Sequence, residues 1–406
     1  MAFRIFYLVT LLTFIFSFQV SAESIEKAAF VRDHKLWIKE GKNEIQITKD
    51  LYVYNPQWSY DGRFLGFMLA EEDGSNSHLF IYDTTEQMTH QPYLTDVSSF
   101  SWSPNSHQIA FKFGSVLNVS NSKSGLPKGF QNVSLGVSSY EWYPNGNEFI
   151  VSSESYVLPT GWEPVRIYKI PVDAKLDETK ITLLYSLPKM TDDFFAVSAG
   201  PFKWSADGKW TSFIATPTPS WAMDSNTLCV LSSDGSKFQM VGKMLGFYDW
   251  FKWAPSKNQL AFISGEGRFF VENKNATVAD IAMKDKLRNF TPSGFVDLDI
   301  EWLSEDEVIV ARAKENKEWN EGPMPTMYTA LYIINIKTGE QKQLTFPKVN
   351  EIDNSTQVIG STITWTRKNE KQDQLDVWIK SNPTCPEQLW LEDVDMAPVF
   401  WGGISG

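Results

Sequence analysis

The 406-residue sequence is poor in the residues that most often build catalytic and metal sites. Its two cysteines are too few for a disulfide-stapled scaffold. The four histidines all lie within the first 107 residues and form neither a His-x-His nor a His-Glu-x-x-His pattern, which argues against a zinc site. A Gly-x-Ser-x-Gly segment, typical of hydrolase nucleophiles, is also missing. The sequence therefore nominates no catalytic residue, no metal ligand and no cofactor.

Positive charge is scarce as well. There are 37 lysines and arginines against 49 aspartates and glutamates, a net charge of −12. A nucleic-acid-binding surface needs clustered basic residues, so we expect no nucleic-acid partner. Adsorption to an anionic bilayer is disfavoured for the same reason.

Long hydrophobic runs are confined to the N-terminus. Arg4 precedes an apolar run over residues 5–18, and Val20, Ser21 and Ala22 follow it. This is the pattern of a secretory signal peptide, and the run is shorter than the roughly 20 residues that a membrane span needs. We therefore predict cleavage after Ala22. Residues 23–406 would then form a soluble, exported domain without a membrane anchor, either secreted or periplasmic.

Tryptophan, by contrast, is abundant and regularly placed. Six of the 16 tryptophans lie in related segments, such as Pro-Gln-Trp-Ser-Tyr-Asp-Gly at residues 56–62 and Phe-Lys-Trp-Ser-Ala-Asp-Gly at residues 202–208. These marker tryptophans, about 49 residues apart on average, are Trp58, Trp102, Trp142, Trp204, Trp253 and Trp302. A period of this length is typical of repeat architectures such as propellers.

Similar residues follow each marker. A turn comes first, then a second strand such as residues 64–69, a third such as residues 78–82, and a short fourth that often ends in Leu-Thr or Phe-Thr. In the fifth unit we expect the third strand at residues 268–272. Four antiparallel strands, repeated without helical periodicity, are typical of propeller blades, whereas a β-sandwich would not need near-identical units. The prediction is an all-β fold consisting of a single β-propeller.

The two ends of the repeat region complement each other. A seventh unit without a marker has its first strand near residues 353–358. Residues 28–48 supply second, third and fourth strands, and residues 398–401 supply a first strand. Pairing these ends would close the ring and hide the sheet edges. We therefore predict eight blades, with seven as the alternative.

The Trp-Ser-x-Asp-Gly segments at residues 58–62 and 204–208, with the apolar strand after them and the Leu-Thr ending at residues 344–345, resemble the TolB-type propeller repeat. The resemblance extends over nearly all of residues 25–402 and implies a propeller fold. It says little about function, because this repeat occurs in scaffolds and as the lid of larger enzymes. TolB proteins carry a separate N-terminal domain, and prolyl-oligopeptidase relatives carry an α/β-hydrolase domain. We expect neither in this sequence.

Two sets of residues are interpreted as structural. Cys229 and Cys385 lie three units apart, so we expect free thiols rather than a disulfide. Acidic residues in the turns between first and second strands, Asp61, Asp207 and Asp306, could suggest calcium. EF-hand spacing is absent, however, and Asp suits a hairpin turn, so we predict no metal site.

The long loops are expected on one face of the ring. In an antiparallel blade, the loop between strands two and three leaves on the same face as the connection to the next blade. The long segments of these kinds span residues 156–164, 188–200, 216–225 and 315–329. Function is commonly found on such loops. They contain the candidate ligand-binding residues Trp162, Phe194, Phe195, Trp221, Trp319, Met324 and Tyr328.

Aromatic side chains beside acidic ones are typical of binding patches. The alternative is that the aromatic residues fold back and plug the mouth of the ring. The sequence thus favours a monomeric, non-enzymatic propeller that binds a protein or glycan ligand through its long-loop face. The alternative function is an exported carbohydrate-active hydrolase or lyase with carboxylates at the channel mouth.

Overall fold

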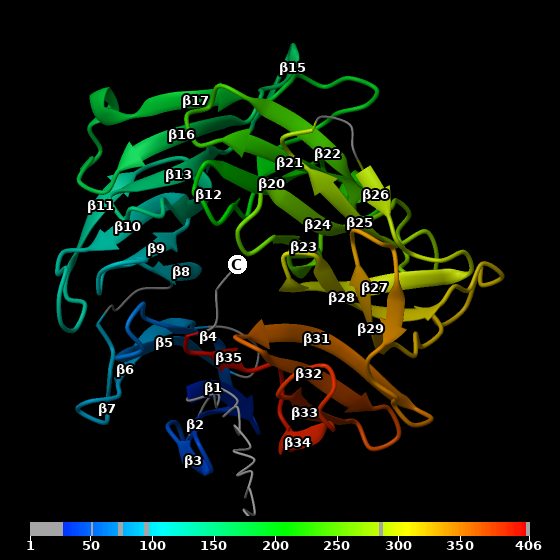
Figure 1. Cartoon of the computed structure of the whole chain (residues 1–406). Coiled ribbons are helices and arrows are strands. Elements are labelled where there is room, and N and C mark those ends of the chain that lie inside the picture. The colour runs from blue at the N-terminus through cyan, green and yellow to red at the C-terminus, as the bar shows by residue number, and fades with distance from the viewer. Residues whose placement is uncertain (1–26, 50–51, 72–75, 93–96, 284–286, 403–406) are drawn as a thin grey trace, which may run out of the picture.

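The computed structural model describes residues 27–49, 52–71, 76–92, 97–283 and 287–402. Eight antiparallel four-stranded sheets surround a common axis as the blades of a propeller (Figure 1). The prediction of an eight-bladed all-β propeller is confirmed, and the seven-bladed alternative is wrong. The predicted signal peptide, residues 1–22, lies outside the described residues.

Blades 1 to 4 follow one another along the chain, each with its first strand nearest the axis. Blade 1 contains β4 (Tyr52–Trp58), β5 (Phe64–Ala70), β6 (His78–Asp83) and β7 (Met88–His90). Blade 2 contains β8 (Ser99–Trp102), β9 (Ile109–Phe113), β10 (Val116–Ser120) and β11 (Phe130–Ser134). Blade 3 contains β12 (Val137–Trp142), β13 (Glu148–Ser153), β16 (Arg166–Pro171) and β17 (Thr182–Ser186). Blade 4 has an interrupted first strand, β18 (Ser198–Ala199) and β19 (Lys203–Trp204), followed by β20 (Trp210–Thr216), β21 (Asn226–Ser232) and β22 (Phe238–Met244).

Blades 5 to 8 complete the ring. Blade 5 contains β23 (Phe251–Trp253), β24 (Gln259–Ser264), β25 (Asn275–Asp280) and β26 (Leu287–Asn289). Blade 6 contains β27 (Phe295–Ser304), β28 (Glu307–Lys314), β29 (Ala330–Asn335) and β30 (Gln341–Gln343). Blade 7 contains β31 (Glu351–Ile359), β32 (Thr362–Asn369), β33 (Gln374–Lys380) and β34 (Gln388–Leu391). Blade 8 combines β35 (Val399–Phe400) with β1 (Lys27–Arg32), β2 (Lys35–Glu40) and β3 (Asn43–Gln46).

Helix is almost absent from the described residues. Besides two 3₁₀ turns, Glu178–Lys180 and Tyr248–Trp250, there is one α-helix of four residues, α1 (Pro219–Ala222), within a long loop. None of these helices has the length and apolar character needed to cross a membrane.

The ring closes through the two ends of the repeat region, as predicted. β35 pairs with β1 in the registers Ala28 to Phe400 and Ala29 to Val399. The two strands lie side by side in Figure 1, one blue and one red. The backbone N–H of Trp401 adds a 3.0 Å hydrogen bond to the carbonyl oxygen of Lys27. Blade 8 therefore depends on both ends of the repeat region.

The marker tryptophans join each blade to the one before it. In all six, the indole Nε1 donates a hydrogen bond of 2.7–3.4 Å to a backbone carbonyl oxygen on the innermost strand of the preceding blade. The pairs are Trp58–Val399, Trp102–Gln57, Trp142–Ser101, Trp204–Trp142, Trp253–Lys203 and Trp302–Lys252. A typical hydrogen bond stabilises a protein by about 1 kcal/mol, so the six together are a substantial term.

The residue before a marker can bind the following blade rather than the preceding one. The Gln57 side chain donates to the carbonyl oxygen of Phe100 in the next blade, at 3.1 Å. In blade 7, Gln357 donates in the same way to Pro398, at 3.0 Å, but Val358 follows it where a marker would stand. The buried Trp365 of β32 packs against blade 6 and supplies an aromatic contact at this interface.

One predicted strand is wrong. Residues 268–272 were expected as the third strand of blade 5, but that strand is β25, which begins at Asn275. The apolar Val271 is buried against Val296 and Ala313 of blade 6 rather than within its own sheet. The alternation of apolar residues therefore reflects a loop that packs on the neighbouring blade. Residues 265–274 form an additional long loop.

Replacing Trp302 with phenylalanine tests the blade-to-blade hydrogen bonds. The variant keeps an aromatic ring but removes the donor to Lys252 and part of the buried volume. We expect the free energy of unfolding to fall by about 2 kcal/mol. The midpoint of urea unfolding measures the change. Trp221→Phe, in an exposed loop, is the matched control and should change it by less than about 0.5 kcal/mol; equal midpoints for the two variants would contradict the role of the indole.

Candidate functional site

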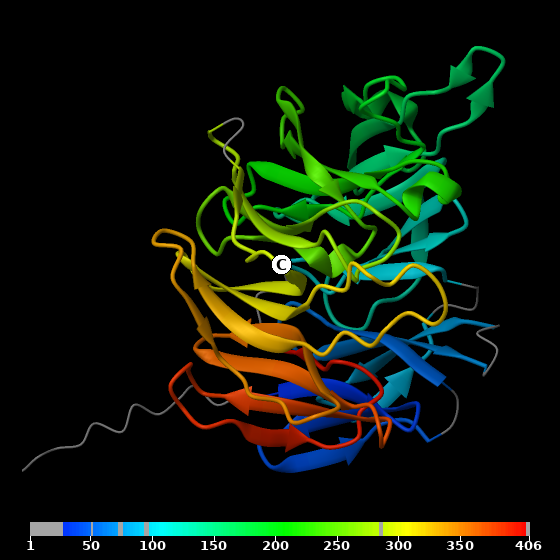
Figure 2. The same ribbon diagram turned by 90° about the vertical axis from the view of Figure 1, so that its right-hand side faces the viewer.

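The long loops gather on one face of the ring. Figure 2 shows the ring from the side, with hairpin β14 (Val157–Leu158) and β15 (Gly161–Trp162), helix α1 and the long loop before β29 on its right-hand side. These segments belong to blades 3, 4 and 6, as expected. The loop of residues 265–274 in blade 5 lies between those of blades 4 and 6 in the sequence of blades.

Three predicted residues form an exposed aromatic cluster. The ring centroids of Trp162 and Phe195 are 6.4 Å apart, and those of Phe195 and Trp221 are 5.6 Å apart with an edge-to-face angle of 83°. Aromatic pairs favour such offset or edge-to-face geometry. Trp162 is 36% exposed and Trp221 is 54% exposed. The cluster spans blades 3 and 4 and keeps a large aromatic surface in contact with solvent.

Phe194 was also predicted to bind ligand, and this prediction is wrong. Its side chain is only 2% exposed and packs in the core with Val165, Leu187 and Phe213. The neighbouring Phe195 meets Trp162 and Trp221 instead, so the Phe194-Phe195 pair places one ring in the core and one in the loop cluster. The sequence did not indicate which ring would face inward.

A second aromatic cluster lies on blades 5 and 6. Phe269 and Trp319 meet edge-to-face, with ring centroids 4.7 Å apart at 87°. The Trp319 indole donates to the carbonyl oxygen of Pro323 at 3.1 Å, which fixes the loop around the ring. Met324 and Tyr328, from the same loop, are 40% and 50% exposed. Phe269 was missed because its segment was interpreted as a strand.

An ion pair joins the two clusters. The Arg268 guanidinium donates to both carboxylate oxygens of Asp224, at 3.1 and 3.2 Å. The backbone N–H of Gly267 also donates to the carbonyl oxygen of Asp224, at 2.8 Å. We call the joined surface the aromatic arc; its members are Trp162, Phe195, Trp221, Phe269, Trp319, Met324 and Tyr328. The arc draws its members from loops of blades 3 to 6, and the Asp224 contacts link the loops of blades 4 and 5.

Charged residues lie close to the ring axis on blades 4 to 6. The Lys203 ammonium donates to the carbonyl oxygens of Tyr248 and Phe251, at 2.7 and 3.1 Å, and lies over the Phe251 ring. Burial, helped by the nearby Lys252, lowers the pKa of Lys203 to about 7. Lys252 lies 3.5 Å from Glu301; burial lowers its pKa, but Glu301 and other acidic neighbours outweigh that effect and raise it.

Two carboxyl groups near the axis behave differently. Burial raises the pKa of Glu141 to about 7, although the Trp142 N–H donates to its carboxylate at 2.8 Å. Burial also raises the pKa of Asp299 to about 6, against hydrogen bonds from the N–H groups of Thr356 and Ile300. Both groups therefore exchange protons close to neutral pH.

His107 holds two blades together and is not available as a catalytic base. Its Nε2 lies 2.7 Å from a carboxylate oxygen of Asp61 in blade 1. Its Nδ1 accepts a hydrogen bond from the Gly125 N–H at 3.0 Å. Burial acts to raise the pKa of Asp61, but hydrogen bonds from His107 and Ser59 lower it below its usual range. Because both ring nitrogens are occupied, a serine hydroxyl has no position at this histidine.

The turn acids likewise have structural partners. Asn258 of blade 5 donates to Asp207 at 3.2 Å, and Lys257 and Lys337 bind Asp306 at 2.7 and 2.6 Å. Within the described ranges, no three His, Cys, Asp or Glu side chains are grouped so that they could hold a metal ion. The turn acids therefore link blades.

The two cysteines are free thiols, as predicted. Cys229 is fully buried on β21, and burial raises the pKa of its thiol. Cys385 is half-buried in the segment before β34. A buried thiol with a raised pKa, such as that of Cys229, is a poor nucleophile.

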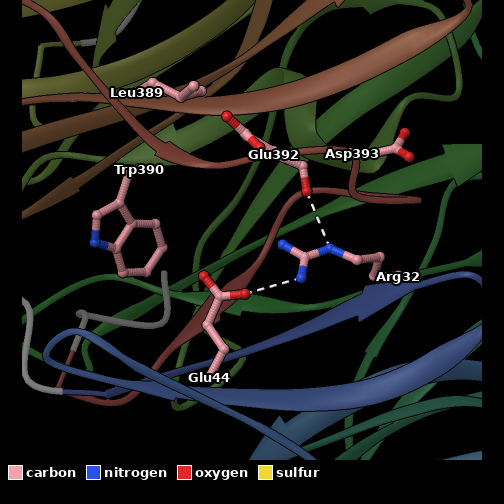
Figure 3. Close-up of a pocket in the computed structure, with 6 residues that line it drawn as sticks. All are labelled: Arg32, Glu44, Leu389, Trp390, Glu392 and Asp393. Carbon is pink, nitrogen blue, oxygen red and sulfur yellow. Dashed lines mark hydrogen bonds and ion pairs between the residues drawn. The ribbon is translucent and has the colours of Figure 1, made fainter.

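A cavity of about 470 Å³ lies at the seam between blades 7 and 8. Figure 3 shows Arg32 between the Glu44 carboxylate and the backbone carbonyl oxygen of Glu392, with hydrogen bonds of 2.8 and 3.0 Å. The Trp390 ring forms the wall to one side, and the Asp393 carboxylate points away from Arg32. The guanidinium thus braces the closing blade against its neighbour, and this cavity belongs to ring closure.

No family model matches the chain, and no curated protein matches it either. Several solved structures that share the fold are those of peptidases. A puromycin-hydrolysing peptidase from Mycobacterium tuberculosis has a TM-score of 0.53 and 14% identity over 86% of this chain. Oligopeptidase B from Trypanosoma brucei has a TM-score of 0.53 and 11% identity over 85% of this chain.

A prolyl endopeptidase is similar as well, with a TM-score of 0.52 and 12% identity over 92% of this chain. The matched region covers 55%, 49% and 49% of these three chains, so this chain spans about half of their length. At these identities the likeness establishes the fold. The prediction of a non-enzymatic ligand binder, with a carbohydrate-active enzyme as its alternative, is contradicted because the similar structures belong to peptidases.

Replacing Glu141 with glutamine tests the buried carboxyl. A carboxyl whose pKa is raised from 4.5 to about 7 on folding contributes stability below pH 4.5 and loses it as pH rises to about 7. Glutamine has no such dependence. The free energy of unfolding of E141Q minus that of the wild type should therefore increase by about 3 kcal/mol over this range and stay level above it. Urea unfolding at several pH values measures the difference, and a pH-independent difference would contradict the assignment.

Proposed function

We propose that this propeller serves peptide hydrolysis as the part of a peptidase that receives the peptide. The observation that carries the proposal is its likeness to peptidase structures, of which it spans about half. The hydrolysing unit lies outside the described residues, either in the same polypeptide or in another. The aromatic arc is the surface on which a peptide first binds.

The arc suits an extended peptide. Aromatic rings at intervals along a surface accept the side chains of a flexible chain while its backbone remains hydrated. Trp162 and Trp221 belong to different blades and are linked through Phe195, so a peptide that spans them would contact three separate loops. The loops are tied to each other and to a rigid ring, which limits the entropy lost on binding.

Two further properties are part of the proposal. We infer that residues 1–22 direct the chain out of the cytoplasm, on the strength of their charge and hydrophobic pattern. We also infer a TolB-type origin of the repeat from its Trp-Ser-x-Asp-Gly segments. The hydrogen bonds of the Ser59 and Asp61 side chains within one such turn give a physical reason to keep that motif.

Fluorescence anisotropy of labelled decapeptides with the full chain tests the proposal. We expect binding that unlabelled peptide displaces and that oligosaccharides do not. A Trp162→Ala/Trp221→Ala variant should bind at least about tenfold more weakly, since exposed aromatic anchors supply about 1–2 kcal/mol each. Trp390→Ala, at the blade 7–8 seam, is the matched control and should bind like the wild type.

Three outcomes would contradict the proposal. The first is no saturable peptide binding at all. The second is displacement of the peptide by oligosaccharides as efficiently as by peptide. The third is cleavage of the peptides by the purified chain, which would show that the hydrolysing unit lies within this chain. We expect mass spectrometry of the same mixtures to find the peptides intact.

A further inference from the structure

The loops that carry the aromatic arc are strongly acidic. They span residues 154–164, 188–200, 217–225, 265–274 and 315–329, and together contain ten acidic and four basic residues, a net charge of −6. This is half of the net charge of −12 of the whole chain. Negative charge is therefore concentrated on the face where the exposed aromatic rings lie.

Most of the basic residues in these loops are already engaged. Arg268 is paired with Asp224, and Lys317 lies 3.2 Å from Glu315. Lys274 is fully buried and donates to two backbone carbonyl oxygens, at 3.0 and 2.9 Å. None of these three cations is available to neutralise other carboxylates of the five loops.

Several carboxylates of these loops, in contrast, are exposed and, among the described residues, unpaired. Lys243 brings a cation to this face, but its ammonium donates to the backbone carbonyl oxygen of Asp193, at 3.0 Å. Five of the carboxylates are exposed and make no ion pair within the part of the chain that the structure describes: Asp192, Asp193, Glu266, Glu318 and Glu321. They come from blades 5 and 6 and from the connection between blades 3 and 4. The arc is thus flanked by negative charge along its length.

We propose that the aromatic arc selects peptides in which lysine or arginine lies beside apolar side chains. The argument is charge complementarity: carboxylates around the arc attract a cationic peptide and repel an anionic one. The rings add to this preference because the face of an aromatic ring attracts an ammonium or guanidinium group, and an arginine plane stacks on it. This inference rests on the proposed function, whose substrate class it specifies.

The test compares three labelled decapeptides that share the same apolar residues and carry two arginines, two glutamines or two glutamates. Anisotropy titrations use the full chain. We expect the arginine peptide to bind at least about tenfold more tightly than the glutamate peptide at low salt. The ratio should shrink severalfold at about 0.5 M NaCl, because exposed charges are screened at that ionic strength.

Variants locate the effect. A triple variant, Asp192→Asn, Asp193→Asn and Glu318→Gln, should lower the arginine-to-glutamate preference severalfold while the glutamine peptide binds as before. The matched control, Asp173→Asn, Glu178→Gln and Glu340→Gln, removes three exposed carboxylates from turns between third and fourth strands, on the other face of the ring, and should leave the preference unchanged. Thermal unfolding midpoints confirm that the variants fold.

The outcomes separate this inference from the proposed function. If no peptide binds, the proposed function fails and the inference fails with it. If all three peptides bind equally, or the glutamate peptide binds best, the inference is overturned while peptide reception stands. If the control variant loses the preference as much as the triple variant does, the selectivity comes from overall charge and the assignment to the arc is overturned.

Discussion

The ring depends on one repeated contact, the hydrogen bond from a tryptophan indole to a backbone carbonyl of the preceding blade. A blade cannot satisfy this donor by itself, so every marked unit requires its predecessor. For Trp58 the predecessor is the strand that contains Val399, which makes closure a condition for the first blade as well. Gln57 adds a second bond to the interface of blades 1 and 2, and Gln357 supplies a bond at the interface of blades 7 and 8, where the marker is missing.

The features that could be predicted from the sequence are those that local patterns determine. The markers and turns are local patterns, so the blade count, the composite blade and the face of the long loops followed from the sequence. What depends on packing between distant segments did not follow. Residues 268–272 alternate like a strand because Val271 packs on blade 6, and Phe194 and Phe195 differ only in which side of the backbone faces the core. Phe269 could be recognised as part of the candidate site only once it was seen against Trp319.

Different parts of the molecule supply its stability and its proposed recognition surface. The ring obtains its stability near the axis and between blades, where the marker tryptophans and the fully buried side chains of the sheets lie. The aromatic arc is built from insertions at the far ends of blades 3 to 6, and its members meet through ring contacts and one ion pair. Such insertions can change in length and composition without disturbing the indole contacts, which fits the use of one fold by several peptidases at very low identity.

The composite blade sets an order of events during synthesis. Strands β1, β2 and β3 leave the ribosome first, whereas β35, which pairs with β1, is made about 370 residues later. At ordinary rates of translation the free edge of β1 waits roughly 20 to 75 s for its partner. An unpaired strand edge is prone to join other chains, so the nascent protein is most vulnerable to misassembly at its oldest part.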